Sequence, residues 1–328
     1  MKLDKNIENL QGYMANQLWL VEGEKIHEVE VPGEGNMNFT LRLKTNQRSV
    51  IIKQSRAYVE KYPQVAAPKK RALMEAAFYQ EICKSEKLKA QMPSLIAVDE
   101  DNSILLMEDL GAGSDYTSIY KDGVEMNETD LLKLMDFTAE LHNSFKADQT
   151  EKPIRNREMR KLNHEHMFVY PYMDENGLNL DDILPGLAAV AEKYKQDKKL
   201  QEKLISIGEL YLADGKHLLH GDFFPGSWLK TTDGVKVIDP EFCFYGSAEF
   251  EIGVTVAHLK MANQSEELIS KAIQQYQSKA KLDTKLMEAH AAAEIMRRIL
   301  GLAQLPLEIN LSKRESLLEE AAQTLLNF

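Results

Sequence analysis

The chain has 328 residues, of which 44% are hydrophobic and 28% charged, and this length suits two domains or lobes better than one. The 51 acidic residues outnumber the 40 basic ones, and the net charge of −11 disfavours both a nucleic-acid partner and an anionic membrane surface. No run approaches the roughly 20 apolar residues of a membrane span, and no apolar secretory leader is visible. The two cysteines, Cys83 and Cys243, lie far apart in the sequence, so a soluble, reduced, cytoplasmic protein is the simple interpretation.

Residues 1–110 predict a small β-rich first lobe. Hydrophobic periodicity and turn residues indicate, in order, a helix near 6–20, strands at 26–31, 39–43 and 49–53, a helix from about 69 to 85 and a strand at 103–107. A glycine-containing break at 110–113 ends this lobe.

Residues 111–328 predict a larger and mainly helical lobe. The expected helices are 128–146, 182–195, 198–214, 248–262, 266–279, 283–304 and 312–326. Between them lies a segment at 217–247 that is rich in strand and turn residues. The chain is therefore expected to be an α+β protein of two lobes.

The 217–247 segment carries the residues with the clearest chemical potential. Asp222 follows His220-Gly221 after an apolar run, and Asp239-Pro240-Glu241 follows a second apolar run at 235–238. With a turn at 232–234 between them, we expect a hairpin that brings the two acidic groups to one place.

Phosphoryl transfer needs such a pair of acidic groups. One carboxylate orients the attacking hydroxyl and accepts its proton, while another holds Mg²⁺ against the phosphates. The oxygen ligands that Mg²⁺ prefers are available from Asp239, Glu241 and the Ser227 hydroxyl. Taken singly, His220-Gly221-Asp222 could be a plain turn and Asp239-Pro240-Glu241 a helix start, but their joint occurrence favours the functional interpretation.

Two weaker signals lie in the first lobe. Gly33-Glu34-Gly35-Asn36 separates two predicted strands, and glycines there would let main-chain N–H groups approach a phosphate. A simple β-turn explains the same residues. Lys53 ends a strand and could neutralise phosphates if Glu75 on the next helix oriented it, although an ordinary strand-end lysine is the alternative.

The order of these motifs resembles the aminoglycoside phosphotransferase and choline kinase superfamily, which has the protein-kinase fold, and within it most closely the 5-methylthioribose kinases. The strings that carry the resemblance are Gly33–Asn38, Ser49–Gln54, Met107–Leu110, Ile238–Gly246 and Met296–Gly301. They span nearly the whole chain. The 238–246 string and the late arginine pair are the specific ones.

The resemblance implies an ATP- and Mg²⁺-dependent kinase with an alcohol group as acceptor. By this resemblance the catalytic base is Asp222, which also contacts the substrate together with Arg297 and Arg298, and the metal ligands are Asp239, Glu241 and Ser227. The ATP-binding residues that it implies are Gly33, Gly35, Asn36, Asn38, Lys53, Glu75 and the hinge Met107, Glu108, Asp109 and Leu110.

The chain also departs from the 5-methylthioribose kinase pattern. Its catalytic loop continues as Phe223-Phe224-Pro225-Gly226-Ser227, where those enzymes typically have Leu-His-Thr-Gly-Ser, and the segment after Lys53 lacks their tryptophan-bearing loop. The sequence therefore predicts a kinase of a small hydroxylated, sugar-like substrate. It leaves open an aminoglycoside, choline or amino-alcohol, or homoserine substrate, a catalytically silent pseudokinase, and homodimer formation.

Overall fold

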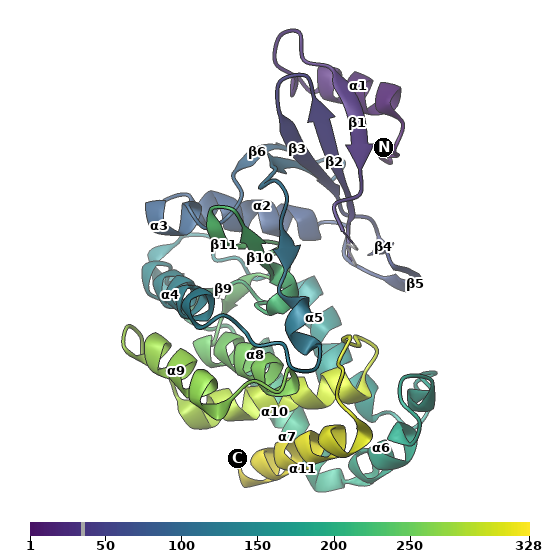
Figure 1. Ribbon diagram of the computed structural model, residues 1–328, viewed down its shortest axis with the longest axis vertical. Coiled ribbons are helices and arrows are strands. Elements are labelled where there is room, and N and C mark those ends of the chain that lie inside the picture. The colour runs from purple at the N-terminus through teal and green to yellow at the C-terminus, as the bar shows by residue number, and fades with distance from the viewer. Residues whose placement is uncertain (34–36) are drawn as a thin grey trace. The chain divides into compact units, whose positions relative to one another are not determined.

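The computed structural model of the chain describes residues 1–33 and 37–328, and these form two compact units. The first unit contains Met1–Ser114 together with Thr231–Phe242, and the second contains Asp115–Lys230 and Cys243–Phe328. Residues 231–242, which lie within the predicted second lobe, thus group with the first unit. They carry strand β11 (Gly234–Val237), drawn in green in Figure 1.

A five-stranded antiparallel sheet forms the centre of the first unit, with the strand order β1-β2-β3-β7-β6. Its strands are β1 (Ile26–Glu30), β2 (Phe39–Thr45), β3 (Ser49–Gln54), β6 (Leu95–Asp99) and β7 (Ile104–Glu108). Strand β3 is central, because it pairs with β2 on one side and β7 on the other, so Lys53 lies between Thr40 and Leu105. Of these strands, only β6 has no counterpart in the sequence-based prediction.

One face of this sheet packs against helix α1 (Ile7–Asn16). Leu10 and Met14, four residues apart on the helix, are buried against Leu41, Val50 and Ile52. Because side chains alternate between the faces of a strand, Lys53 projects from the opposite face. There it meets helix α2 (Arg71–Ile82), whose Glu75 contacts the Lys53 ammonium.

The remaining elements of the first unit are short. They are α3 (Glu86–Lys89) and a hairpin of β4 (Tyr58–Val59) and β5 (Tyr62–Ala66). The 231–242 segment is anchored in this unit by two hydrogen bonds, from Val237 N to Gln91 O and from Lys236 Nζ to Ala90 O, both 2.8 Å.

The second unit is mainly helical, as Figure 1 shows in teal, green and yellow. Its helices are α4 (Glu128–Ser144), α5 (Arg157–His164), α6 (Leu187–Gln196), α7 (Lys198–Leu212), α8 (Ala248–Met261), α9 (Glu266–Gln277), α10 (Thr284–Leu300) and α11 (Leu311–Asn327). Short 3₁₀ turns occur at Thr117–Tyr120, Ala147–Gln149, Tyr170–Tyr172, Leu180–Asp182 and Pro225–Ser227, and a π-helical turn at Glu165–Val169.

Helices α8 and α10 form the buried centre of the second unit. Their close approach depends on Gly253 of α8, where an added Cβ would lie 2.7 Å from Met287 O and 2.9 Å from His290 Cβ. Polar residues also lie on the buried sides of these helices, among them His258 on α8 and Glu294 on α10. These two are central to the site described below.

The strands around Asp222 differ from the predicted hairpin. Strand β9 (His217–Leu219), which precedes Asp222, pairs antiparallel with β12 (Phe244–Gly246). The turn at 232–234 instead joins β10 (Trp228–Thr231) to β11, and β8 (Ser114–Asp115) lies where the chain leaves the first unit. The hairpin prediction was wrong because an additional strand, β10, intervenes between the two acidic motifs.

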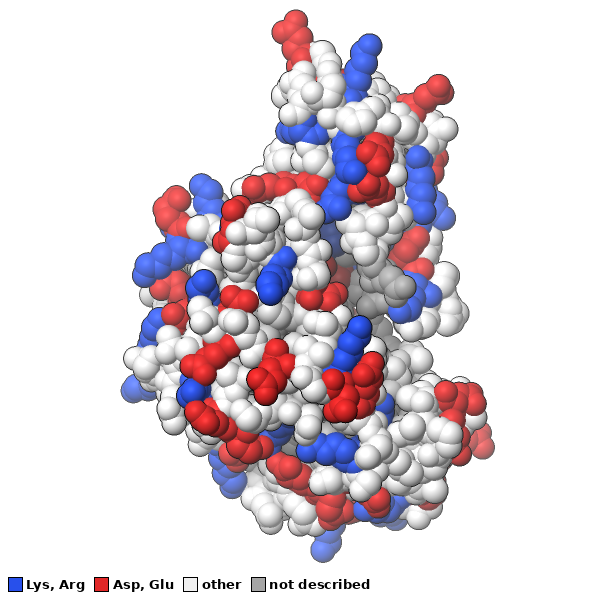
Figure 2. Space-filling view, in the orientation of Figure 1, with Lys and Arg blue, Asp and Glu red and all other residues white. Residues whose placement is uncertain are grey.

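The charged surface and the lengths of the helices bear on the predicted partners of the chain. On the face drawn in Figure 2, Asp and Glu side chains are interspersed with Lys and Arg, in keeping with 51 acidic and 40 basic residues. Among the described residues, no helix is both long and apolar enough to traverse a bilayer.

Candidate active site

A buried ion-pair cluster in the first unit joins Lys53, Glu75 and Asp239. The Lys53 Nζ lies 3.0 and 2.9 Å from the two carboxylate oxygens of Glu75 and 2.6 Å from Asp239 Oδ1. The Lys53 and Glu75 side chains retain 5% and 0% of their exposure, whereas Asp239 retains 51%. Asp239 also has a left-handed φ of 64°, which is costly for a residue with a Cβ.

The charges of this cluster stabilise one another. Burial alone would lower the pKa of Lys53, but Asp239, Glu75 and Glu241 outweigh it and raise that pKa above its ordinary value. Burial also raises the pKa of Glu75 to about 7, with Lys53 opposing the shift. The lysine is therefore held as a charged ammonium with its position fixed by carboxylates.

Glu241 belongs to the same unit and has partners of its own. Its Oε2 accepts a hydrogen bond from Asn38 Nδ2 at 2.9 Å and lies 3.2 Å from Arg71 Nε. Arg71, the first residue of α2, also donates to the main-chain oxygens of Met37 and Tyr58. Burial raises the pKa of Glu241, while Lys53 and Arg71 oppose the shift.

The predicted glycine turn is described only at its ends. Gly33 has a φ of 90°, the left-handed region that favours glycine, and Asn38 is buried. The predicted residues Gly35 and Asn36 lie outside the described residues. Asn38 Oδ1 is buried without a hydrogen-bond partner among the residues that the structure describes.

The predicted hinge, Met107–Leu110, completes β7 and the turn that follows it. Asp109 fixes this turn to the sheet, because its carboxylate accepts two hydrogen bonds from Arg42, at 2.8 and 3.0 Å, and one from Ser49 Oγ at 2.5 Å. Burial opposes ionisation of Asp109, yet Arg42 and Ser49 lower its pKa below the ordinary value. Asp109 thus has an anchoring contact that the sequence did not indicate.

In the second unit, the loop that carries Asp222 is bound to helix α8. The Gly221 N–H, at a φ of 85°, donates to Glu251 Oε1 at 2.9 Å, and the other oxygen of Glu251 lies 2.9 Å from His142 Nε2. Ser227 Oγ donates to the main-chain oxygen of Asp222 at 2.8 Å. The buried carboxylate of Glu251 and the Ser227 hydroxyl therefore hold the loop on both sides of Asp222.

The Asp222 carboxylate faces a cluster of charged groups on α10. Its Oδ1 lies 3.8 Å from Arg298 Nη2, and its side chain retains 28% of its exposure. Burial raises the pKa of Asp222, while Arg298 and Arg297 oppose the shift. A carboxylate with a raised pKa is better suited to accept a proton near neutral pH.

Arg297 and Arg298 share one buried carboxylate, that of Glu294. Arg298 Nε donates to Glu294 Oε1 at 2.8 Å, and Arg297 Nε donates to Glu294 Oε2. His258 Nε2 lies 2.9 Å from Glu294 Oε1. Burial would raise the pKa of Glu294, but Arg297 and Arg298 lower it well below its ordinary range.

The aromatic residues after Asp222 differ in their surroundings. Phe223 and Trp228 are 1% and 0% exposed, and Phe223 stacks on Phe137 with ring centroids 6.0 Å apart, so both belong to the core. Phe224 is only half-buried, and its ring centroid lies 5.0 Å from that of His258 and 4.9 Å from the Arg298 guanidinium carbon. Phe224 thus places an aromatic side chain beside Arg298.

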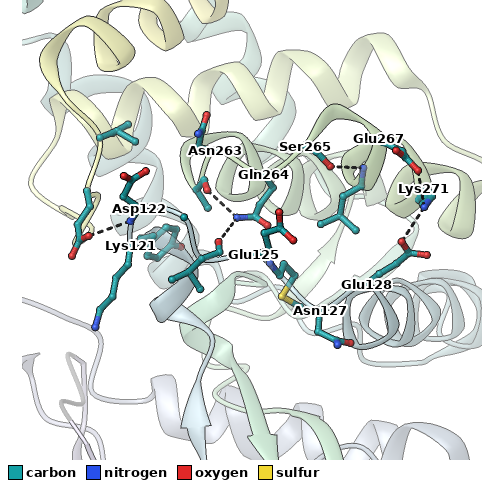
Figure 3. A pocket seen from close by; sticks show the side chains of 18 residues that line it. Lys121, Asp122, Glu125, Asn127, Glu128, Asn263, Gln264, Ser265, Glu267 and Lys271 are labelled. Atoms are coloured by element: carbon teal, nitrogen blue, oxygen red, sulfur yellow. Dashed lines mark hydrogen bonds and ion pairs between the residues drawn. The ribbon is translucent and has the colours of Figure 1, made fainter.

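A separate pocket of about 740 Å³ opens in the second unit between the 120–128 and 262–271 segments. Figure 3 shows Lys271 paired there with both Glu128 and Glu267, each at 2.9 Å. None of its 18 lining residues is a predicted site residue. Within the described residues, no group of three or more His, Cys, Asp or Glu side chains is arranged to hold a metal by itself.

Sequence reasoning did not find Arg71, Glu251, Glu294 or His258. Each is a buried polar residue whose partner comes from a distant segment, apart from the contacts of Glu294 with its own helix. The only local signal was that Glu294 lies three and four residues before the arginine pair, a spacing that places side chains on one helix face.

With this geometry in view, the comparisons with known proteins decide the family. The model of the phosphotransferase enzyme family (APH) matches residues 28–325. The chain belongs to this family. Its predicted resemblance to aminoglycoside phosphotransferases and 5-methylthioribose kinases is confirmed.

Curated relatives of this phosphotransferase-family chain include methylthioribose kinases. Those of Exiguobacterium sibiricum and Bacillus cereus (strain B4264) are 25% and 29% identical over 75% and 74% of this chain, and methylthioribose kinase 1 of Oryza sativa subsp. japonica is 28% identical over 72%. The matches cover 64%, 61% and 56% of those proteins, so the chain spans less than two thirds of their length.

Solved structures similar to this phosphotransferase-family chain agree on the fold. Choline kinase LicA from Streptococcus pneumoniae has a TM-score of 0.54 at 13% identity, covering 98% of this chain and 99% of that one. Spectinomycin phosphotransferase APH(9)-Ia, in complex with ADP and spectinomycin, has a TM-score of 0.54 at 13% identity, covering 98% and 97%. The predicted α+β, protein-kinase-like fold is confirmed.

Proposed function

We propose that this member of the phosphotransferase family is an ATP-dependent kinase that phosphorylates a hydroxyl group of a small sugar-like metabolite, of the 5-methylthioribose type. The observation that carries the proposal is the pair of charged clusters: Lys53–Glu75–Asp239 in the first unit, and Asp222 beside Arg298 in the second. The methylthioribose kinases among the relatives support the substrate class.

The first unit would bind the nucleotide. Lys53, charged and fixed by Glu75, offers its ammonium to phosphate oxygens. Main-chain N–H groups of the glycine turn, at Gly33, Gly35 and Asn36, would approach the same phosphates, and main-chain groups of 107–110 would pair with adenine. The buried, unpartnered Asn38 Oδ1 supports a polar ligand near this turn, since no described residue satisfies it.

Mg²⁺ fits the acidic residues of the same cluster. Asp239 and Glu241 would hold the ion, because carboxylate oxygens are the ligands it prefers, and Asp239 keeps 51% of its side-chain exposure. When bound, Mg²⁺ supplies positive charge against the phosphate oxygens. The Ser227 hydroxyl, predicted from the sequence as a further oxygen ligand, would be the third.

Asp222 would act as the base. Its carboxylate orients the acceptor hydroxyl and takes its proton as the acceptor oxygen bonds to the γ-phosphorus and the bond to the ADP oxygen breaks. The raised pKa of Asp222 supports this role, because a weakly basic carboxylate would hold the proton less well. Arg298 Nη2, 3.8 Å away, offsets negative charge as the phosphoryl group moves.

Arg297 and Arg298 would set the substrate class. Their guanidinium forks suit vicinal hydroxyl groups and phosphate oxygens, and they would repel a polycationic aminoglycoside. The half-buried Phe224 offers an apolar surface to a sugar face or a thioether. Choline and amino alcohols are cations as well, whereas homoserine carries a carboxylate that a guanidinium can bind, so the assay below compares sugars with these classes.

A coupled ADP-release screen tests the proposal. The purified protein is assayed with ATP and Mg²⁺ against 5-methylthioribose, other pentoses, amino alcohols, homoserine and kanamycin, and mass spectrometry identifies the product. We expect turnover of 5-methylthioribose or a related sugar that disappears in Asp222→Asn. Turnover of kanamycin with every sugar inert would contradict the substrate class, and MgATP binding without any turnover would identify a pseudokinase.

The cellular setting belongs to the same proposal. Cys83 and Cys243 lie far apart in the sequence, and two such isolated cysteines support a reducing, cytoplasmic environment for the enzyme. Its partner would be the small hydroxylated substrate.

A further inference from the structure

Arg297 and Arg298 point their guanidinium groups at one carboxylate although they are neighbours on a helix. Consecutive residues of an α-helix project about 100° apart, so two adjacent arginines would ordinarily diverge. Glu294 lies three residues before one and four before the other, and its two oxygens accept the Nε–H groups of both. This spacing makes a single carboxylate sufficient to draw both side chains to one side of α10.

We propose that Glu294 is a positioning residue for the acceptor site, one that aligns Arg297 and Arg298 and leaves Nη2 of Arg298 and the Nη atoms of Arg297 to face the substrate beside Asp222. The inference rests on the proposed kinase function. With both Nε atoms occupied, Arg298 Nη2 is directed to Asp222 at 3.8 Å and Nη1 to Ala303 O at 3.3 Å. No described residue accepts a hydrogen bond from the Arg297 Nη atoms.

Two further residues fix the carboxylate of Glu294. Its Oε1 is 2.9 Å from His258 Nε2, and His258 Nδ1 is 2.5 Å from the Tyr120 hydroxyl. Because Glu294 is ionised and can only accept, we assign the imidazole proton to Nε2, so that Tyr120 donates to Nδ1. A carboxylate held by three donors in a fully buried position cannot change its orientation cheaply.

The charge balance favours the same role. Two guanidinium groups and the Glu294 carboxylate leave one positive charge, which the Asp222 carboxylate neutralises before substrate arrives. When Asp222 takes the acceptor proton, the group as a whole becomes positive and faces the newly phosphorylated oxygen. Without Glu294, two uncompensated arginines would repel each other and move apart.

The test compares Glu294→Gln, Glu294→Asp and a control, Glu288→Gln, which alters an exposed glutamate on the same helix. Steady-state kinetics are measured with 5-methylthioribose and ATP, and MgATP affinity by calorimetry. A second measurement follows the Nε–H signals of Arg297 and Arg298 by ¹⁵N NMR. Each signal is assigned by its disappearance in Arg297→Lys or Arg298→Lys. This second readout needs no turnover, so it separates the role of Glu294 from the identity of the substrate.

We expect Glu294→Gln to lower kcat/KM for 5-methylthioribose by roughly 10²-fold, because a misplacement of about 1 Å has that effect, with MgATP affinity unchanged. Glu294→Asp should recover part of the loss, and both Nε–H signals should shift in Glu294→Gln but not in Glu288→Gln. Unchanged kinetics, or equal losses of acceptor efficiency and MgATP affinity, would overturn the proposal. Should 5-methylthioribose be inert with the wild type, unaltered Nε–H signals in Glu294→Gln would overturn it.

Discussion

His258 makes the stability of the protein depend on pH in a calculable way. Burial lowers the pKa of this histidine from 6.5 to about 4, with Arg298 and Arg297 acting in the same direction and the hydrogen bond to Glu294 opposing them. The native protein therefore keeps His258 neutral at pH 5, whereas the unfolded chain protonates it below pH 6.5. Since the unfolded state binds more protons, stability must fall as the pH decreases through this window.

The magnitude follows from the two pKa values. For one group with an unfolded pKa of 6.5 and a native pKa of about 4, lowering the pH from 7 to 5 removes about 2 kcal/mol from the free energy of unfolding. Other groups titrate in the same range, including His290, whose pKa burial also lowers to about 4. A difference between two proteins is therefore needed to isolate His258.

The assay is urea unfolding of the wild type and of His258→Gln at pH 7 and pH 5. Glutamine can still donate to Glu294 and accept from Tyr120, but it does not titrate. The wild type should lose about 2 kcal/mol more than the variant between the two pH values, because only the wild type carries the titrating His258. An identical pH dependence in wild type and His258→Gln would refute the assignment of a neutral His258.

Four other substitutions test the site and the packing of the helices. Asp222→Asn should lower kcat by roughly 10²- to 10⁴-fold in the ADP-release assay and leave MgATP affinity near that of the wild type, because only the base is removed. Asp239→Ala should weaken MgATP binding more than metal-free ATP binding in calorimetry, and equal weakening would contradict a metal role. Gly253→Ala should cost about 1–3 kcal/mol of unfolding free energy because its Cβ would lie 2.7 Å from Met287 O. Gly12→Ala, at an exposed position of α1 where an added Cβ would meet no other part of the protein within 4 Å, should instead stabilise by about 1 kcal/mol in the same urea titration.

Hydrophobic periodicity predicted the long helices well and the weakly patterned elements poorly. The predicted helix 128–146 is observed as Glu128–Ser144, because its apolar stripe is continuous. Helix α5, Arg157–His164, was missed because only Met159 and Arg160 in it are buried. Its position depends on Arg160, which donates to the main-chain oxygens of Tyr211 and Ala213, and such distant contacts leave no local pattern.

The site residues also divide into those that a local sequence pattern predicts and those that it does not. The order of the motifs led to Lys53 and Glu75, which the structure brings to 2.9 Å of each other. The buried acids Glu251 and Glu294 could not be found in this way, because a buried carboxylate is recognised by partners from other segments. Glu251 meets His142 and the Gly221 N–H only after α4, α8 and the catalytic loop have come together.

The return of residues 231–242 to the first unit has a consequence for how the protein is made. During synthesis on a ribosome, the chain completes the five-stranded sheet by residue 108, yet Asp239, Glu241 and strand β11 are not available until more than a hundred further residues have been added. A fragment ending at Ser114 therefore keeps Glu75 but lacks Asp239 and Glu241, which pair with the buried Lys53 and Arg71. A single cut in the chain cannot release the first unit. Residues 115–230 form a long insertion between the two parts of the chain that make up this unit.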